Sequence, residues 1–526
     1  MSLRHTLSIL FSISALMATA QAPFSKWIVQ SGDSVNNTTP SNSRMPFLPL
    51  TSGELLYCAC RSPSFVDRCR FTRLSTDGDP LGQWEIQAPS LINNSFQIHQ
   101  VIELADGSFA CFGHYDYWAL YMRIAQDGTI LTAKSYSVVG IGILAPIHWN
   151  DAVQDAAGHF VVAGQWGGAS PTGMISRIAL DGTLLGSGFI DIGSASYTFF
   201  HSLVRLPDGD IVFHGSSNFL GNHASTYLFR TDSLLSPEWA RAYPDSGYSY
   251  SISRVFRLDD GSYRMVLRTL DPNNIYAPLV VAAAADGTPM WGRRRIPPAS
   301  YPNMIVFANS PQMVGDTIVL VGDAWSGNQE FVELLDTDGD ELLMGEVEMP
   351  SPVASASLSA AQLHIAGYDQ GPLGSGSRSL GITRLDFDLA HCGTIYHSTG
   401  SSMWVPGMDT TWSLVTAPVT VTDVLTEFLS YPTTAYSQMI CTSTGISIEN
   451  EPAPVILPNP ASDRINIRSE GIETVEIIDA TGRVMIARSL RGEGSVAIEL
   501  SSFATGIYHL RMLTSKGWRT EKLIKE

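Results

Sequence analysis

The stretch Phe160-Val161-Val162-Ala163-Gly164 decides the fold, because similar segments recur along the first 400 residues. Each is a short apolar run, usually preceded by Gly or Asp-Gly and often ending in Gly, as expected for a buried strand between turns. The seven segments are Leu55–Ala59, Phe109–Gly113, Phe160–Gly164, Ile211–Gly215, Tyr263–Leu267, Ile318–Gly322 and Leu363–Gly367. Their last residues lie 54, 51, 51, 52, 55 and 45 positions apart. A period near 50 residues is typical of β-propeller blades.

A second element recurs in phase with the first, a strand that runs into an acidic turn. Its copies are Arg73–Gly78, Arg123–Gly128, Arg177–Gly182, Arg230–Ser233, Ala284–Gly287, Asp336–Gly339 and Arg384–Asp388. Asp-Gly indicates a two-residue hairpin turn, because Gly supplies the positive φ that such a turn requires. Each repeat thus has two hairpins, or about four strands. We expect an all-β fold with a seven-bladed β-propeller-like domain over residues 23–398; an open β-solenoid is the alternative.

The repeats resemble the delta-60 and quinoprotein-like propeller repeats, in which an aromatic residue follows the turn. Asp286–Trp291 fits this pattern, and Trp84 and Trp239 fit it with shifted spacing. The resemblance implies a shared fold only, because one fold serves many functions.

The last residues, 455–526, form a separate β domain with short alternating strands. Its notable features are the opening Pro458-Asn459-Pro460, a turn that contains Gly482, the step from Gly506 to Tyr508, and a final strand with Lys522 and Lys525. Together they resemble the C-terminal sorting domain (type A) of the type IX secretion system of Bacteroidota. The resemblance implies recognition by the type IX machinery and passage through the outer membrane. It further implies removal of the tail, with the cargo released or attached to surface lipopolysaccharide. We expect a small Ig-like β-sandwich here.

The N-terminus also predicts export. Arg4 and His5 precede an apolar run, Leu7–Met17, that is too short to span a bilayer and is followed by the small residues Ala18–Ala22. This order indicates a signal peptide over residues 1–22, cut after Ala20 or Ala22. We therefore predict a secreted or outer-membrane surface protein that travels through the periplasm.

Two segments separate the repeats from the tail. Residues 399–448 are rich in Ser, Thr and Tyr, and we expect an extra hairpin packed on the propeller or a segment that closes it. Residues 449–457 contain Glu451-Pro452-Ala453-Pro454 and indicate a stiff linker. The formal net charge of -18 argues against nucleic acid or anionic lipid as a partner.

The six cysteines allow disulfides in an exported chain. Sequence alone cannot choose among about 15 pairings. We predict Cys392 with Cys441, and Cys58 or Cys60 with Cys69. A metal site at these last three is a weaker alternative, because their spacing is not that of a zinc ribbon.

Motifs of known catalysts are missing from the sequence. There is no Gly-x-Ser-x-Gly elbow, no His-Glu-x-x-His and no Walker loop. Asp336–Glu341 invites a calcium hypothesis, but an ordinary repeat turn explains it as well. The histidines are scattered, at His99, His114, His148, His159, His201, His214 and His223. We expect His114 and His214 to be structural, and we predict no cofactor and no metal.

Aromatic residues follow equivalent strands in three repeats, at Trp118, Trp166 and Trp325. Loops at equivalent blade positions share one rim of a propeller, so these residues are candidates for a binding rim, although they would equally well cap the blades. We predict a surface binding or adhesion module for a glycan or protein ligand. The alternative is a polysaccharide-acting hydrolase or lyase with its site in the propeller funnel.

Overall fold

The computed structural model describes the strands and tight turns of most of the chain. The described residues are 24–30, 46–61, 68–88, 96–138, 147–167, 172–191, 198–217, 225–244, 248–249, 254–270, 276–296, 306–307, 311–323, 329–348, 353–359, 362–370, 378–385, the strands between 395 and 442, 455–457, 459–479, 483–514 and 517–525. The chain divides into two compact units, Met1–Ser443 and Thr444–Glu526, which we call the ring unit and the tail unit. Within the described residues, no helix is long and apolar enough to cross a membrane. The predicted signal peptide, residues 1–22, lies outside them.

Antiparallel sheets account for the described part of the ring unit, and we label them A to G. Sheet B contains β2 (Phe47–Pro49), β3 (Leu55–Arg61), β4 (Arg68–Leu74) and β5 (Pro80–Gln87). Sheet C contains β6 (Phe96–Glu103), β7 (Phe109–Tyr115), β8 (Trp118–Ile124) and β9 (Ile130–Val138). Sheet D contains β10 (Ile147–Gln154), β11 (Phe160–Trp166), β12 (Thr172–Ile178) and β13 (Leu184–Asp191). Sheet E contains β14 (Thr198–Arg205), β15 (Ile211–Ser217), β16 (Ser225–Thr231) and β17 (Pro237–Pro244).

The remaining sheets follow the same plan. Sheet F contains β18 (Tyr248–Ser249), β19 (Arg254–Arg257), β20 (Tyr263–Leu270), β21 (Tyr276–Ala283) and β22 (Pro289–Ile296). Sheet G contains β23 (Val306–Phe307), β24 (Gln312–Val314), β25 (Thr317–Asp323), β26 (Gln329–Asp336) and β27 (Glu341–Glu348). Sheet A contains β28 (Val353–Ser359), β29 (Gln362–Gln370), β30 (Arg378–Leu385) and β1 (Phe24–Gln30). The seven apolar segments of the sequence thus form β3, β7, β11, β15, β20, β25 and β29, one in each sheet.

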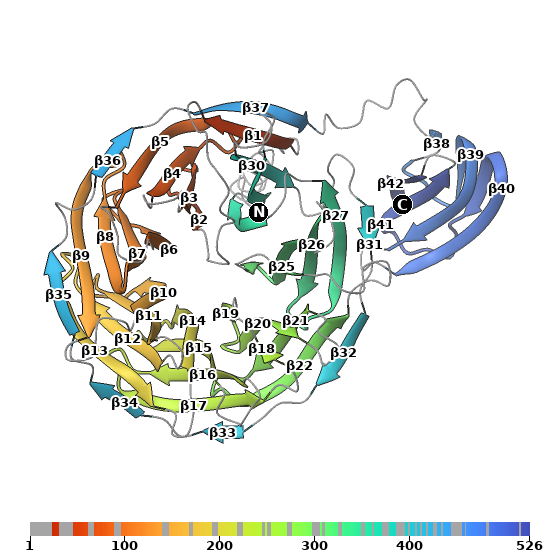
Figure 1. Ribbon diagram of the computed structural model, residues 1–526. Helices are drawn as coiled ribbons and strands as arrows, with labels where there is room; N and C mark the ends of the chain where they lie inside the picture. Colours follow the sequence, from red (N-terminus) through yellow and green to blue (C-terminus); the bar gives the residue numbers. More distant parts are fainter. Residues whose placement is uncertain are drawn as a thin grey trace, which may run out of the picture. The chain divides into compact units, whose positions relative to one another are not determined.

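Apolar side chains lie between successive sheets all the way around the ring unit. Alternate residues of β3 show how: Leu56 and Cys58 join the core between sheets B and C, whereas Leu55 and Tyr57 join the core between sheets A and B. Both faces of the strand are therefore buried, which explains its continuous apolar run. Further cores lie between sheets C and D, D and E, E and F, F and G, and G and A. The sheets close into a propeller-like ring, with β6, β10 and β14 on its inner side (Figure 1); an open solenoid would leave two ends.

The acidic turns differ from the prediction in length. In sheet C, Gly128 N–H donates to Ala125 O over 3.0 Å and Ala125 N–H donates to Thr129 O over 2.8 Å. The connection therefore has three residues instead of two, with Gly128 in the left-handed region at a φ of 90°. In sheet E, Leu235 takes the same position with a φ of 69°.

The aromatic residue that follows a turn in the predicted pattern packs on the turn of the next sheet. A Cβ on Gly128 would lie 2.6 Å from Trp84 Cγ, and one on Gly287 would lie 2.6 Å from Trp239 Cζ3. Glycine is therefore required here by space as well as by φ. The pattern is thus a contact between neighbouring sheets.

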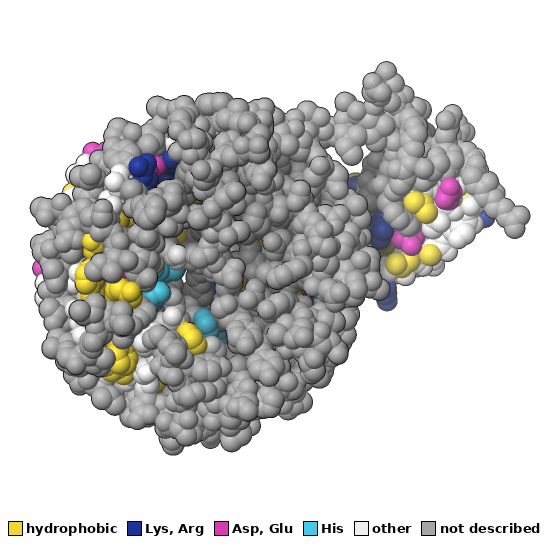
Figure 2. Space-filling model, viewed as in Figure 1, with side chains coloured by type: hydrophobic (Ala, Val, Ile, Leu, Met, Phe, Trp, Pro, Cys, Tyr) yellow, Lys and Arg dark blue, Asp and Glu magenta, His cyan; other side chains and the backbone are white. Residues whose placement is uncertain are grey.

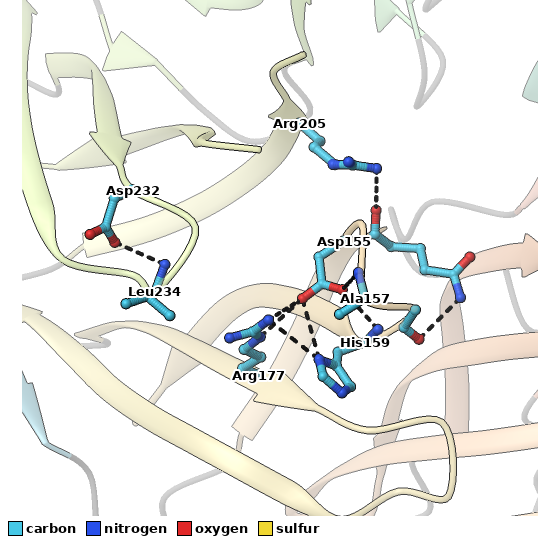
Figure 3. Close-up of polar contacts among 9 residues, drawn as sticks. Asp155, Ala157, His159, Arg177, Arg205, Asp232 and Leu234 are labelled. Carbon is cyan, nitrogen blue, oxygen red and sulfur yellow. Dashed lines mark hydrogen bonds and ion pairs between the residues drawn. The ribbon is translucent and has the colours of Figure 1, made fainter. Parts of the chain in front are cut away.

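Ion pairs fasten the two hairpins of a sheet to each other. In sheet D, Arg177 Nε donates to Asp155 Oδ2 over 3.0 Å, while Asp155 Oδ1 accepts the backbone N–H groups of Ala157 and His159 (Figure 3). Burial raises the pKa of Asp155, but the hydrogen bonds and the charge of Arg177 outweigh it and leave the pKa below its usual value. Equivalent pairs join Arg73 to Glu54 and Arg123 to Asp106. The arginines that precede the acidic turns are therefore structural.

Residues 395–442 add one further, outermost strand to every sheet. These strands are β31 (Ile395–His397) on sheet G, β32 (Gly400–Trp404) on F, β33 (Met408–Thr410) on E, β34 (Ser413–Thr416) on D, β35 (Val419–Asp423) on C, β36 (Leu429–Pro432) on B and β37 (Ala435–Thr442) on A. Their order is the reverse of the sheet order, so the segment runs back around the outside of the ring (Figure 1). We call it the belt. Instead of one hairpin or one closing segment, it pairs the outer edge of every sheet, which would otherwise present unpaired backbone groups.

Strand β1 closes the ring. It lies between β30 and β37, with Phe24 opposite Arg384 and Lys26 opposite Met439. The N-terminal strand of the described chain therefore completes the last sheet.

The tail unit forms one connected sheet with its own core. Its strands are β38 (Val455–Leu457), β39 (Arg464–Ile478), β40 (Val484–Glu499), β41 (Gly506–Thr514) and β42 (Gly517–Lys525). β39 pairs with β38, β40 and β41, with shifts of register near Ile472 that bend it. Ile477, Leu510 and Leu523 are fully buried in the core. The Ig-like sandwich stays a prediction.

Candidate functional site

The innermost strands of sheets C, D and E each contain a β-bulge at an equivalent position. The register shifts between Ile98 and Gln100 in β6, between Trp149 and Asp151 in β10, and between Phe200 and Ser202 in β14. The extra residues are His99, Asn150 and His201. A bulge bends the strand and redirects a side chain, and bulges are frequent beside functional sites.

The bulges explain the glycine that ends the predicted strands. A Cβ on Gly113 would lie 1.9 Å from Gln97 O, and one on Gly164 would lie 1.8 Å from His148 O. The carbonyl of the bulged strand lies so close to the second strand that no other residue fits. The Gly at this position is therefore a sequence mark of the bulge.

Each bulge in sheets C and E brings its histidine to a polar side chain of the second strand. His99 Nε2 and His114 Nδ1 lie 3.0 Å apart, and one donates a hydrogen bond to the other. His201 Nε2 and Ser216 Oγ lie 2.8 Å apart in the same arrangement. His114 and Ser216 occupy equivalent places, each one residue after the strand glycine.

A third imidazole joins the pair in sheet C from the neighbouring sheet. His148 of β10 stacks on His114 with ring centroids 4.0 Å apart and planes 23° apart. The potential ligand atoms of His99, His114 and His148 all lie within 4.8 Å of one another. We call these three residues the histidine cluster. Among the residues that the structure describes, no other group of three or more His, Cys, Asp or Glu side chains is as closely gathered.

The cluster lies at the inner side of the ring unit, where Figure 2 shows histidine side chains near the centre. His99 and His114 are buried, and His148 is half-buried. Burial lowers the pKa of His148 to about 4. Burial, and then the neighbouring His148 and His99, hold the pKa of His114 well below its usual value. These two imidazoles are therefore neutral at pH 7, the form in which histidine accepts a proton or binds a metal.

The remaining described histidines stand apart from the cluster. His159 lies in the turn beside Asp155, at the other end of β10 from His148. His214 is buried and its Nε2 lies 2.8 Å from Thr226 Oγ1, a structural contact as predicted. His114, also predicted to be structural, is buried and contacts both other members of the cluster. His223 lies outside the described residues.

The predicted rim tryptophans are only partly exposed. Trp118 begins β8, packs against the core between sheets B and C and contacts Tyr115 with ring centroids 5.7 Å apart. Trp166 ends β11, packs against the core between sheets C and D and contacts Phe189 with centroids 5.0 Å apart. Both lie next to the connection between the second and third strands of their sheets, Trp118 at the start of the third strand and Trp166 at the end of the second. Trp325 lies outside the described residues, and a binding role for the three stays a prediction.

Cys60 and Cys69 form a disulfide, which confirms one predicted pairing and excludes the metal site suggested for Cys58, Cys60 and Cys69. Cys58 and Cys111 are free and buried. Cys392 and the side chain of Cys441 lie outside the described residues, so their pairing stays a prediction. In the turn considered for calcium, Asp336 Oδ1 accepts the backbone N–H groups of Asp338 and Asp340 over 2.9 and 2.8 Å, as in other repeat turns.

The motif residues of the tail unit fasten its beginning to its last strand. Asn459 Nδ2 donates to Lys522 O over 2.7 Å, and Asn459 Oδ1 accepts the N–H of Ile524 over 2.9 Å. Ala461 forms a parallel β-bridge with the buried Lys525.

Two further motif residues lie at the start of β41. Tyr508 Oη donates to Ala504 O over 2.8 Å, two residues before Gly506. Lys522 itself is exposed, while Pro458 and Gly482 lie outside the described residues.

Comparison with known proteins gives one family. Residues 455–526 match the family described as the secretion system C-terminal sorting domain. No curated protein matches the chain in sequence.

Similar solved structures are distant. Polysaccharide lyase Uly1 has 11% identity and a TM-score of 0.43, covering 72% of this chain and 95% of its own. Drosophila Plexin A in complex with Semaphorin 1b has 10% identity and a TM-score of 0.38, covering 71% and 89%. Trypanosoma rangeli sialidase has 10% identity and a TM-score of 0.29, covering 70% and 61%. At these scores none supports an argument about activity. The tail unit, in contrast, carries a type IX sorting domain, which indicates export of the chain to the medium or the cell surface.

Proposed function

We propose that this protein is a cargo of the type IX secretion system whose ring unit, a seven-bladed propeller, is a binding or adhesion module at the cell surface. The proposed export is based on the match of residues 455–526 to the sorting-domain family. The folded core of the tail unit supports it, because a domain with its own buried side chains can be recognised apart from its cargo. Removal of the tail and attachment to lipopolysaccharide belong to the same proposal.

The proposed binding function of the ring unit is based on the region around the histidine cluster. Ile147 N–H donates to Tyr117 O over 2.9 Å, which ties the turn before Trp118 to the strand that carries His148. Asp116 in this turn is buried and has a positive φ of 56°. Such backbone strain is often retained at functional sites. Neutral imidazoles on β7 and β10, together with the half-buried Trp118 and Trp166 at the ends of β8 and β11, suit a neutral glycan, whose hydroxyl groups donate and accept hydrogen bonds and whose ring packs on aromatic faces.

An enzyme is the second candidate, a polysaccharide-acting hydrolase or lyase. The histidine cluster is its candidate site, because neutral imidazoles accept hydrogen bonds from substrate hydroxyl groups, although their lowered pKa makes them weak bases. A glycan array and a polysaccharide digest with the same purified protein separate the two functions. Binding without product supports the module, and product formation that is lost in His114→Gln supports the enzyme.

Export is tested by deleting Val455–Glu526 in a host with a working type IX system. The truncated chain should fold and remain in the periplasm, and a matched fusion of Thr444–Glu526 to an unrelated periplasmic reporter should bring that reporter to the surface. Protease accessibility on whole cells reports the location. Unchanged surface display of the truncated chain would overturn the proposal.

A further inference from the structure

We propose that His99, His114 and His148 bind a divalent transition-metal ion between sheets C and D. The three imidazoles come from three strands of two neighbouring sheets. His99 is the bulge residue of β6, His114 lies on β7, and His148 lies on β10 of the next sheet. One ion would therefore join two sheets of the ring.

The distances leave room for such an ion with small side-chain movements. His99 Nε2 and His114 Nδ1 are already 3.0 Å apart, and no ligand atom of the three is farther than 4.8 Å from another. Zn–N bonds of about 2.0–2.1 Å with tetrahedral angles place ligand nitrogens about 3.4 Å apart. His148, which is half-buried and stacked on His114, has to turn its ring edge toward the ion. His99 and His114 are buried and already lie side by side.

The chemistry of the donors selects the kind of ion. Three imidazoles suit Zn²⁺, Cu²⁺ or Ni²⁺ and disfavour Ca²⁺ and Mg²⁺, which prefer oxygen ligands. Three protein ligands leave a coordination position for water or a ligand, as in catalytic zinc sites. His148 is half-buried on the innermost strand of its sheet, so solvent reaches the cluster.

The repeat itself provides comparison sites within the same molecule. At the positions of His114 and His148, the interface between sheets D and E has Gln165 and Phe199. Sheet E keeps the bulge histidine His201 but pairs it with Ser216. Sheets D and E thus repeat the backbone geometry without three imidazoles. These residues also indicate substitutions that this backbone accepts: His99→Asn, as in Asn150; His114→Gln, as in Gln165; and His148→Phe, as in Phe199.

The test uses the full mature chain without a histidine tag. The protein is loaded with Zn²⁺, dialysed and analysed for bound metal by mass spectrometry. About one ion per chain should remain, and His99→Asn, His114→Gln and His148→Phe should each lower the affinity at least tenfold, because a three-ligand site loses one ligand. The control His201→Asn, which removes the equivalent bulge histidine of sheet E, should bind as the original protein does.

Two further measurements distinguish loss of metal binding from loss of folding and from binding by a cysteine. Circular dichroism shows whether each variant is folded, and His148→Phe is the variant least disturbing to the core because His148 is the most exposed member. Co²⁺ loading should give the visible bands of a nitrogen site without a thiolate-to-metal charge-transfer band. No retained metal in the original protein, unchanged binding in folded His148→Phe, or a thiolate band from Cys58 or Cys111 would each overturn the proposal. This inference does not depend on the proposed binding module, and loss of export would leave it untouched.

Discussion

The ring unit and the tail unit close their sheets in different ways. In the ring unit each sheet shares an apolar core with the sheet on either side, and the circle is closed by β1, whose partners β30 and β37 lie more than 350 residues away in the sequence. In the tail unit one sheet encloses one core, and Asn459 fastens the first strand to the last within 70 residues. The stability of the ring unit therefore depends on all of its sheets together, whereas the tail unit is stabilised by its own core.

Deleting Phe24–Gln30 should have the largest effect and should break the ring alone. Sheet A loses the strand between β30 and β37, and both neighbours lose their backbone partners. We expect the ring unit to lose its cooperative unfolding transition, while the transition of the tail unit stays where it is. Differential scanning calorimetry measures both transitions. Deleting Thr444–Glu526 is the control and should leave the ring transition unchanged; a stable ring without β1 would contradict this account of closure.

Acid should weaken the ring more than the tail. The pKa values of His148 and His364 are each lowered by burial to about 4. A folded pKa below the unfolded value means that protonation favours unfolding, so the stabilisation is present above pH 6.5 and is lost as the pH falls toward 4. A shift of this size corresponds to up to about 3 kcal/mol for each histidine. Among its described residues the tail unit has no buried histidine, so its stability should change little.

Urea unfolding at pH 7 and pH 5 tests the acid prediction. The free energy of unfolding of the ring should fall between these pH values, and His148→Phe should reduce the fall because it removes one titrating group. An equal free energy of unfolding of the ring at both pH values would contradict the prediction, because it would show that protonation of the buried histidines does not destabilise the folded ring.

Asn459→Ala should have the smallest effect and should be confined to the tail. The substitution removes two hydrogen bonds between Asn459 and the backbone of β42, at a cost of about 1–2 kcal/mol to the tail. Asn459→Asp is the matched control, because it keeps the acceptor for the N–H of Ile524 and loses the donor to Lys522 O. Hydrogen exchange of the β42 amides measures the change. A comparable loss of protection in the ring would show that the two units are not independent.

The local elements of the ring were predictable from the sequence. Apolar runs such as Phe160–Gly164 are buried on both faces, and the acidic turns carry Gly at a positive φ. The apolar run and the turn can each be recognised from a few neighbouring residues. An extra β segment over residues 399–448 was expected, but its course along every sheet was not, because strands such as Met408–Thr410 have no apolar pattern and form by pairing with an edge that the rest of the ring supplies. The role of β1 was missed for the same reason, since its partners are distant.

The histidine cluster was also missed, although a signal was present. Asn150 lies 51 residues after His99, and His201 lies 51 residues after Asn150, which equals the spacing of the strands around them. Aligning the repeats would have marked these as equivalent positions. Gly113 and Gly164 mark the bulges in the sequence, but no sequence signal shows that His99 faces His114, that His201 faces Ser216, or that His148 comes from the adjoining sheet. That information lies in the register of the strands.

Because the belt runs back around the ring, sheet A is completed late in synthesis. β1 is among the first segments to leave the ribosome, but its partner β30 follows about 360 residues later and β37 later still. At about 5–20 residues per second, β1 waits roughly 20–70 s for β30, with both edges open to other chains. The strand that leaves first is thus the last to be enclosed. A chaperone or an exported, unfolded state that covers Phe24–Gln30 during this interval would protect the chain at its most vulnerable point.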